Sequence, residues 1–252
     1  MANPIPTLSL DLNDDWRHFQ GQTTKNAARL IGVINEILAR DSLSGAFFES
    51  GTYRGLSAMI FLGLGTVSGA VLVDQTNYLE SDKIAKYTHK PFKLHIGRSE
   101  DFDFSSLDFG VPLVWAHLDA SHYFSNVIHE ITCVSEIMDR KGMIVLDDWN
   151  DVYGQVKAAY YFLRYQGCEW ELLVTGFNKA ILVNKRIYDI YSKRLIELFS
   201  ADIFINGELW PVQLCRTDIS EWCRSFTVRP RGEDEDHFYG RKIWGDRFYQ
   251  VA

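Results

Sequence analysis

The chain has 252 residues, of which 46% are hydrophobic and 14% aromatic, and its formal net charge is −7 at pH 7. This length and apolar content can bury one large core. The negative charge argues against a broad nucleic-acid-binding face, which needs clustered Lys and Arg. The longest apolar stretches, such as residues 58–64, are much shorter than a membrane span.

Neither a secretion signal nor a disulfide framework is expected. The first residues, Met-Ala-Asn-Pro-Ile-Pro, contain no basic patch followed by an apolar segment. Four scattered cysteines are too few for a disulfide framework or a paired-cysteine zinc site; they are Cys133, Cys168, Cys215 and Cys223. The sequence therefore predicts a reduced, cytoplasmic protein.

The first predicted element is a helix that begins at Thr23 or Thr24 and runs to about residue 40. Its apolar residues recur at three- and four-residue steps and form one buried face. They are Ala27, Leu30, Ile31, Ile34, Ile37 and Leu38. Residues 41–45 then break the helix.

Short apolar runs alternate with helical segments from residue 46 onward. Strands are predicted over 46–48, 70–73, 92–96, 113–118 and 143–146, and helices notably over 56–64 and 125–138. Each strand is almost continuously hydrophobic, as expected for strands with helices on both faces. The alternation indicates a parallel sheet with right-handed crossovers.

The end of this region predicts an antiparallel hairpin. Two strand-like runs, 169–175 and 179–184, flank Gly176-Phe177-Asn178, so the pair is expected to close the edge of the sheet. A helix over 186–199 follows. Residues 200–252 carry no predicted organisation, and the acidic run 233–236 is interpreted as a solvated loop.

These elements predict an α/β fold with a Rossmann-like, doubly wound sheet of seven strands, mostly parallel with a C-terminal antiparallel hairpin. Three regions are expected. Residues 1–45 form an N-terminal helical cap region, 46–185 a cofactor-binding core, and 186–252 a C-terminal extension of the same domain.

The sharpest local motif is Glu49-Ser50-Gly51-Thr52-Tyr53-Arg54-Gly55-Leu56-Ser57, which joins a predicted strand to a helix. Gly51 permits a tight turn close to a ligand, and Gly55 permits close packing of the helix on the strand. An acid at Glu49 would repel a pyrophosphate but pairs well with an ammonium group, such as the one in S-adenosylmethionine (SAM). A purely structural turn is the alternative.

Two later polar residues extend this pattern. Asp74 ends the next strand, about 20 residues after Gly51, which is the offset at which an acid meets ribose hydroxyls in such folds. Ser99 follows the third strand, where an adenine edge would lie. The alternatives are that Asp74 caps the next element and that residues 97–99 form an ordinary turn.

Carboxylates gather where two further strands end. Asp119 follows the strand over 113–118, and Asp147 and Asp148 follow the strand over 143–146. These strand ends should be neighbours at the ligand-binding edge of the sheet. Three converging carboxylates repel one another unless a cation lies among them, and oxygen ligands suit Mg²⁺, or else Mn²⁺ or Ca²⁺. Alternatively, Asp147 or Asp148 caps a helix and Asp119 holds a loop.

Together, the Glu49–Ser57 motif, Asp74, Ser99, Asp119 and the Asp147-Asp148 pair resemble class I SAM-dependent O-methyltransferases of the metal-dependent type. The resemblance covers roughly residues 25–185. Two branches are similar, the catechol O-methyltransferases and the macrocin-type sugar O-methyltransferases, and the stretch 118–149 is most similar to the bacterial group that contains the second branch.

The resemblance implies a role for each matching position. Glu49 and Ser57 would hold the methionine part of SAM, with the backbone of Gly51 and Tyr53 beside it and Gly55 completing the turn. Asp74 would bind the ribose, Ser99 the adenine, and Asp119, Asp147 and Asp148 a divalent metal.

Three positions depart from the two branches. Catechol enzymes usually carry Asn in place of Asp148 and Lys in place of His122, while macrocin-type enzymes usually carry Asp in place of Ser121. His122 is a candidate base, because its ordinary pKa of about 6.5 suits proton transfer near neutrality. The catalytic candidates are therefore His122 and Asp119.

Three functional hypotheses follow. The first is a divalent-metal-dependent O-methyltransferase acting on a small-molecule hydroxyl, such as a sugar, polyketide or phenolic diol. The second is a metal-independent N- or O-methyltransferase, and the third is a non-catalytic binding protein with this fold. The apolar segments of the tail are expected either to cover the pocket or to pack on a second subunit in a homo-oligomer.

Overall fold

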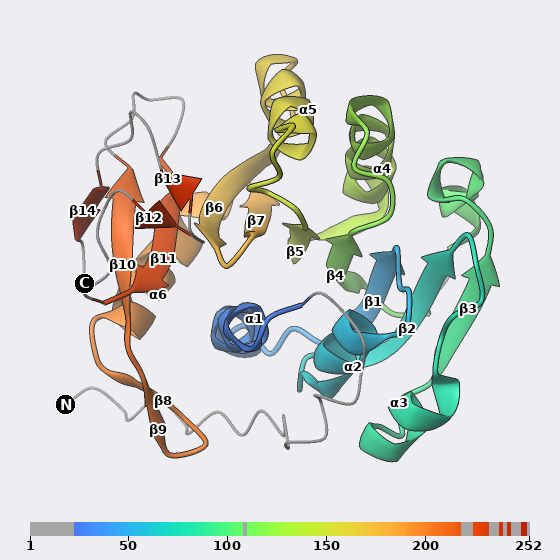
Figure 1. Cartoon of the computed structure of the whole chain (residues 1–252), viewed down its shortest axis with the longest axis horizontal. Helices are drawn as coiled ribbons and strands as arrows, with labels where there is room; N and C mark the ends of the chain where they lie inside the picture. Colours follow the sequence, from blue (N-terminus) through green and yellow to red (C-terminus); the bar gives the residue numbers. More distant parts are fainter. Residues whose placement is uncertain are drawn as a thin grey trace.

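The computed structural model describes residues 23–107, 110–217, 224–231, 237–238, 241–242 and 248–250 (Figure 1). Five parallel strands form the middle and one side of its main sheet. They are β1 (Gly45–Ser50), β2 (Val67–Asp74), β3 (Phe92–Ile96), β4 (Leu113–Leu118) and β5 (Met138–Leu146). The predicted parallel α/β arrangement is confirmed.

The predicted hairpin is present as β6 (Trp170–Gly176) and β7 (Lys179–Asn184), and β7 pairs antiparallel with β5. The tail adds β10 (Val212–Thr217), β11 (Phe226–Pro230) and β14 (Phe248–Gln250). The sheet therefore has ten strands, in the order β14-β10-β11-β6-β7-β5-β4-β1-β2-β3.

Helices cover both faces of this sheet (Figure 1). One face carries α1 (Lys25–Ala39), α2 (Leu56–Gly63) and α6 (Tyr188–Phe199), which share a buried apolar cluster. The other face carries α4 (Phe124–Ile137) and α5 (Gln155–Tyr165), which contribute to a second cluster. A short helix, α3 (Ser81–Tyr87), precedes β3, and two 3₁₀ turns, Ser99–Asp101 and Phe104–Ser106, follow it.

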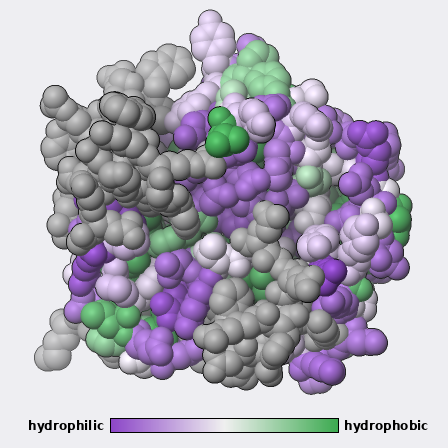
Figure 2. All heavy atoms as spheres, in the orientation of Figure 1, coloured by the Kyte–Doolittle hydropathy of each residue, from purple (hydrophilic) through white to green (hydrophobic). Residues whose placement is uncertain are grey.

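The remaining described strands form two small hairpins. They are β8 (Ile203–Ile205) with β9 (Glu208–Trp210), and β12 (His237–Phe238) with β13 (Arg241–Lys242). In the space-filling view, hydrophilic side chains gather over the middle of the face shown (Figure 2). None of the helices in the described ranges combines the length and apolar character needed to cross a bilayer.

Local sequence explains where α1 begins. Thr24 is the N-cap, and its hydroxyl accepts a hydrogen bond from the Ala27 amide at 3.1 Å, which satisfies one free donor of the first turn. The predicted apolar residues of this helix are all buried. Burial of this face, rather than helix propensity alone, stabilises α1.

Two predictions about the sheet were wrong. The expected count was seven strands, and the hairpin was expected to close the sheet edge. Instead β6 pairs in parallel with β11, through Phe226 opposite Val174 and Thr227 opposite Thr175. This pairing joins segments about fifty residues apart and has no local sequence signal, so the pattern of short apolar runs missed it.

The three-region division stays a prediction, although the sheet itself runs across residue 185. The acidic run 233–236 lies outside the described residues.

Candidate active site

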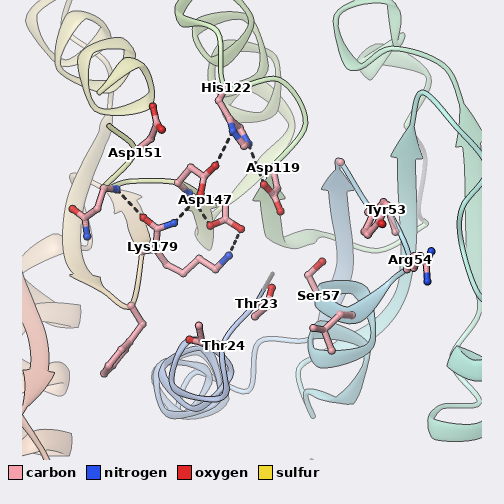
Figure 3. A pocket seen from close by; sticks show the side chains of 17 residues that line it. Thr23, Thr24, Tyr53, Arg54, Ser57, Asp119, His122, Asp147, Asp151 and Lys179 are labelled. Carbon is pink, nitrogen blue, oxygen red and sulfur yellow. Dashed lines mark hydrogen bonds and ion pairs between the residues drawn. The ribbon is translucent and has the colours of Figure 1, made fainter. Parts of the chain in front are cut away.

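Two cavities lie at the edge of the sheet where the parallel strands end, and they share Gly51, His122 and Asp151 in their walls. The first cavity, of about 500 Å³, is shown in Figure 3 and contains the predicted acidic residues. The second, of about 710 Å³, contains Asp74 and Ser99. The edge predicted to bind ligands is therefore hollowed in two adjoining parts.

The turn after β1 depends on Gly51. Its φ is +82°, and a Cβ atom built on it would lie 2.0 Å from the carbonyl oxygen of Asp119. Glycine is therefore required because two segments of the chain approach each other, with the Asp119 amide also bonded to the Ser50 carbonyl at 2.9 Å. The turn fixes the end of β1 against the end of β4.

Gly55 has a different role from the one expected. It is the N-cap of α2 with φ +92°, and a Cβ atom there would lie 2.6 Å from Ile84 and 2.7 Å from Leu79. Its close neighbours are thus Leu79 and, within α3, Ile84, rather than the strand. Ser57, in the first turn of α2, lines the first cavity, as does the exposed Tyr53.

Asp74 connects this turn to the second cavity. Its Oδ2 accepts from the Tyr53 amide at 2.7 Å, and its Oδ1 accepts from the Thr76 amide at 2.9 Å. Ser99 lies in the same cavity and is buried. The structure thus brings these two predicted residues into one cavity. Asp74 does not cap the next helix, as the alternative expected, because the N-cap of α3 is Glu80.

Glu49 lies beneath the cavities rather than in their walls. It is fully buried, and its Oε1 is 2.8 Å from Nδ1 of His117, the residue opposite it on β4. Its Oε2 has no hydrogen-bond partner among the described residues. Burial lowers the pKa of His117, but contacts with Asp147 and Glu49 outweigh it and raise this pKa to about 9.

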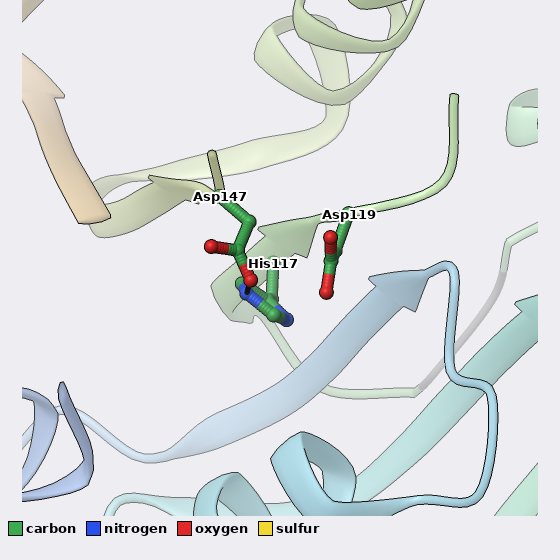
Figure 4. Close-up of side chains that lie close together, drawn as sticks. All are labelled: His117, Asp119 and Asp147. Carbon is green, nitrogen blue, oxygen red and sulfur yellow. Dashed lines mark ion pairs between the residues drawn. The ribbon is translucent and has the colours of Figure 1, made fainter. Parts of the chain in front are cut away.

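His117, Asp119 and Asp147 lie close together (Figure 4); the two acids line the first cavity, and His117 is fully buried. Each offers one potential ligand atom, and these atoms all lie within 4.8 Å of one another. Burial and the nearby charge of Asp147 raise the pKa of Asp119 to about 7. The pKa of Asp147 is lowered, because the charges of Lys179 and His117 outweigh its burial.

Lys179, at the start of β7, forms an ion pair with Oδ2 of Asp147 (Figure 3). Only 3% of the Lys179 side chain is exposed, so its ammonium lies inside the acidic group rather than in water. Buried lysines are rare unless they are paired, and Asp147 is its partner.

His122 bridges two carboxylates. Its Nε2 is 3.2 Å from Oδ1 of Asp119, and its Nδ1 is 2.7 Å from Oδ2 of Asp148. Hydrogen bonds to Asp119 and Asp148 outweigh burial and raise the pKa of His122 to about 10. The expectation of a neutral histidine base does not match this environment, because an imidazolium has no free lone pair for a proton.

Asp148 does not belong to the group formed by His117, Asp119 and Asp147. Its φ is +50°, and besides His122 it accepts a hydrogen bond from the Asn178 amide group at 2.7 Å. Asn178 also accepts from two backbone amides, those of Trp149 at 3.1 Å and Asn150 at 2.9 Å. The turn between β6 and β7 thus fixes the segment that follows β5.

The predicted metal ligands do not fit a divalent ion in this arrangement. The carboxylate of Asp147 is bound by an ammonium, and Asp119 and Asp148 share an imidazolium. Nδ1 of His117 contacts Glu49 at 2.8 Å, and its Nε2 lies 3.5 Å from Asp147. The repulsion that suggested a metal is relieved by cations of the chain itself.

Three residues of this site were not predicted from the sequence: His117, Asn178 and Lys179. His117 interrupts an apolar strand two positions before Asp119, and Lys179 opens a strand whose residues 180–183 are apolar. Since β7 is antiparallel to β5, its first residue lies beside the last residues of β5. A lysine there, preceded by Asn178 in the turn, was the available signal.

No protein-family model and no curated protein matches the sequence. Solved structures do resemble the fold. A candidate caffeoyl-CoA O-methyltransferase from Staphylococcus aureus aligns over 68% of this chain and 88% of its own, with a TM-score of 0.52 and 12% identity. A candidate O-methyltransferase from Klebsiella pneumoniae aligns over 73% and 92%, with a TM-score of 0.50 and 12% identity.

A third structure, cofactor-bound Rv0187 from MTB, aligns over 66% of this chain and 83% of its own, with a TM-score of 0.50 and 16% identity. At these identities the likeness establishes the fold. The chain therefore has the Rossmann-like fold that these O-methyltransferases share.

Proposed function

We propose that this chain is a SAM-dependent methyltransferase that acts on a hydroxyl group of a small molecule. The observation that carries the proposal is the pair of adjoining cavities at the carboxyl edge of the sheet, one with Asp74 and Ser99 and the other with a charged group around Asp119. Ligands bind at this edge in open α/β sheets.

The residues present fit the parts of SAM. The second cavity offers Asp74, whose remaining lone pairs suit ribose hydroxyls, and Ser99 for the adenine. The first cavity offers Ser57 and the amino end of α2 for the methionine carboxylate. Glu49, the residue expected to hold the ammonium, has an unpartnered Oε2 but lines neither cavity.

When bound, SAM supplies a methyl group on a positively charged sulfur, which is already a good leaving group. The chain has to hold an acceptor oxygen about 3 Å from that methyl carbon, opposite the sulfur. Asp119 is the residue proposed to accept the hydroxyl proton, because its pKa of about 7 matches neutral pH. His122 holds Asp119 in place as a charged hydrogen-bond partner.

Of the two catalytic hypotheses, the contacts of the acidic residues favour methyl transfer without a metal. The predicted Mg²⁺ would compete with Lys179 for Asp147 and with His122 for Asp119 and Asp148. No step of the proposal therefore depends on a metal. A low-molecular-weight acceptor and a cytoplasmic location belong to the proposal, and the net charge of −7 argues against a nucleic-acid acceptor.

Calorimetric titration with SAM and with S-adenosylhomocysteine (SAH) tests the proposal. The full chain should bind both, and Asp74→Asn should weaken binding about 10- to 100-fold, since it removes a charged acceptor. Asp82→Asn, an exposed acid nearby on α3, is the matched control. Failure of the full chain to bind either compound would support the third hypothesis, a fold without this cofactor.

A further inference from the structure

Lys179 is the buried cation of the first cavity. Its side chain is 3% exposed, it is paired with Asp147, and it lines the cavity wall. The ammonium therefore sits on a member of the group that could otherwise hold a metal.

A divalent ion at this group would meet an obstacle at Asp147. It would have to displace the ammonium from Asp147 and then remain close to it, with the two positive charges in a poorly hydrated space. It could reach His117 only through Nε2, which has no hydrogen-bond partner among the described residues, because Nδ1 already contacts Glu49.

The neighbouring carboxylates give no second metal position. Asp148 is bound by His122 and by the amide of Asn178, and Asp119 is bound by His122. Each of the three acids named by the sequence thus contacts a cation of the chain. These contacts form two sets, one around Asp147 and one around His122.

We propose that Lys179 is the resident cation of this site, so that its ammonium occupies the place a divalent metal would take and the chain binds SAM without one. The role of Lys179 as resident cation rests on the ion-pair geometry, whereas the binding of SAM without a metal rests on the proposed function. The two are therefore tested by separate measurements.

The first measurement is Mn²⁺ binding, followed by the loss of the free-ion electron paramagnetic resonance signal. The full wild-type chain should bind Mn²⁺ no better than Lys185→Met, in which an exposed lysine paired with Glu169 is removed. Lys179→Met should bind Mn²⁺ at least about tenfold more tightly, because Asp147 then loses its ammonium and is free to act as a ligand.

Loss of Lys179 leaves Asp147 buried without a cation and threatens folding. Lys179→Arg retains the charge and should behave like the wild type. Wild-type protein that binds Mn²⁺ stoichiometrically with a Kd below about 100 µM, and loses this binding in Asp147→Asn, would overturn the proposal without any Lys179 variant.

The second measurement is SAM binding by calorimetry in EDTA and in excess Mg²⁺. Equal affinities are expected under both conditions. A requirement for Mg²⁺ would overturn the inference, while absence of SAM binding in both solutions would overturn the proposed function and leave the Mn²⁺ titration to decide the role of Lys179.

Discussion

Glu130 is a carboxyl group enclosed between α4 and the end of β1. It is 1% exposed, and its pKa is raised to about 7 because burial outweighs the effect of the nearby Ser99 and Ser50 hydroxyls. The folded protein therefore holds a proton that the unfolded chain loses above its ordinary pKa of 4.5. Stability falls as pH rises from that value through about 7.

Glu130→Gln should remove this pH-dependent loss. At pH 8 the variant should be more stable than the wild type, by on the order of 2 to 3 kcal/mol, and near pH 4.5 the difference should vanish. Urea unfolding at both pH values measures it. Glu136→Gln, an exposed residue of the same helix, should change neither value. An advantage of equal size at both pH values would show that ionisation of Glu130 is not the cause.

Asp119 gives a second pH dependence, this time in cofactor binding. Its pKa of about 7 means that it is mostly protonated at pH 6 and charged at pH 8. The sulfur of SAM is positively charged and that of SAH is neutral, so the preference for SAM over SAH should rise about three- to tenfold between these pH values. Calorimetry with both compounds checks this. Asp119→Asn should show no such rise, and a rise retained in that variant would exclude Asp119 as its source.

At the scale of elements, the turn between β1 and α2 depends on the glycine that contacts β4. Gly51→Ala should destabilise the fold by about 3 kcal/mol or more, because its Cβ would meet the Asp119 carbonyl and φ is +82°. Gly63, at the end of α2, has open space around it, so Gly63→Ala should stabilise by about 0.5 kcal/mol. Thermal melting of both variants measures the contrast. A Gly51→Ala protein that melts within about 2 °C of wild type would contradict this close approach.

The local sequence pattern predicted which segments form helices and strands, but it did not predict several of their boundaries. The predicted β3 and β4 coincide with the observed strands, but β5 begins at Met138 rather than at residue 143. After the buried Met138, residues 139–141 are polar and not buried, so this part lacks the apolar run of a covered strand.

The small hairpin of β8 and β9 was missed despite a signal. Asn206 and Gly207 both have positive φ, and an Asn-Gly pair between short apolar runs is typical of a tight hairpin turn.

For the site, too, local sequence predicted some features and missed others. Strand-end residues were predicted to meet, and Asp119, His122, Asp147 and Asp148 do line one cavity. Their partners were not predicted, because Lys179 reaches Asp147 through the antiparallel pairing of β7 with β5. Chemical type and order along the chain indicate which groups gather, but the charge balance among them depends on tertiary contacts.

At the scale of the whole molecule, the tail continues the sheet. Through β11 and β10 the strands after α6 extend the sheet from β6, and Trp210 packs against Phe177 and Phe199 in the same apolar cluster as α1. A shared core and a continuous sheet couple the two regions energetically.

We therefore expect one cooperative unfolding transition. Differential scanning calorimetry should give a calorimetric enthalpy equal to the van't Hoff enthalpy. SAM should move the whole transition upward if it binds the folded chain. Two separate transitions, with only one shifted by SAM, would show that the region after residue 185 unfolds independently.

The hydrogen bonds of Asn178 bear on attempts to re-engineer this protein. Through its carbonyl, side-chain oxygen and amide, this one residue fastens Asp148, Trp149 and Asn150 to the β6–β7 turn. These hydrogen bonds join the two segments into one structural unit although they are distant in the chain. A designer who replaces the loop after β5 would therefore have to replace the β6–β7 turn together with it. A library that randomises either segment alone would mostly contain variants that have lost these hydrogen bonds.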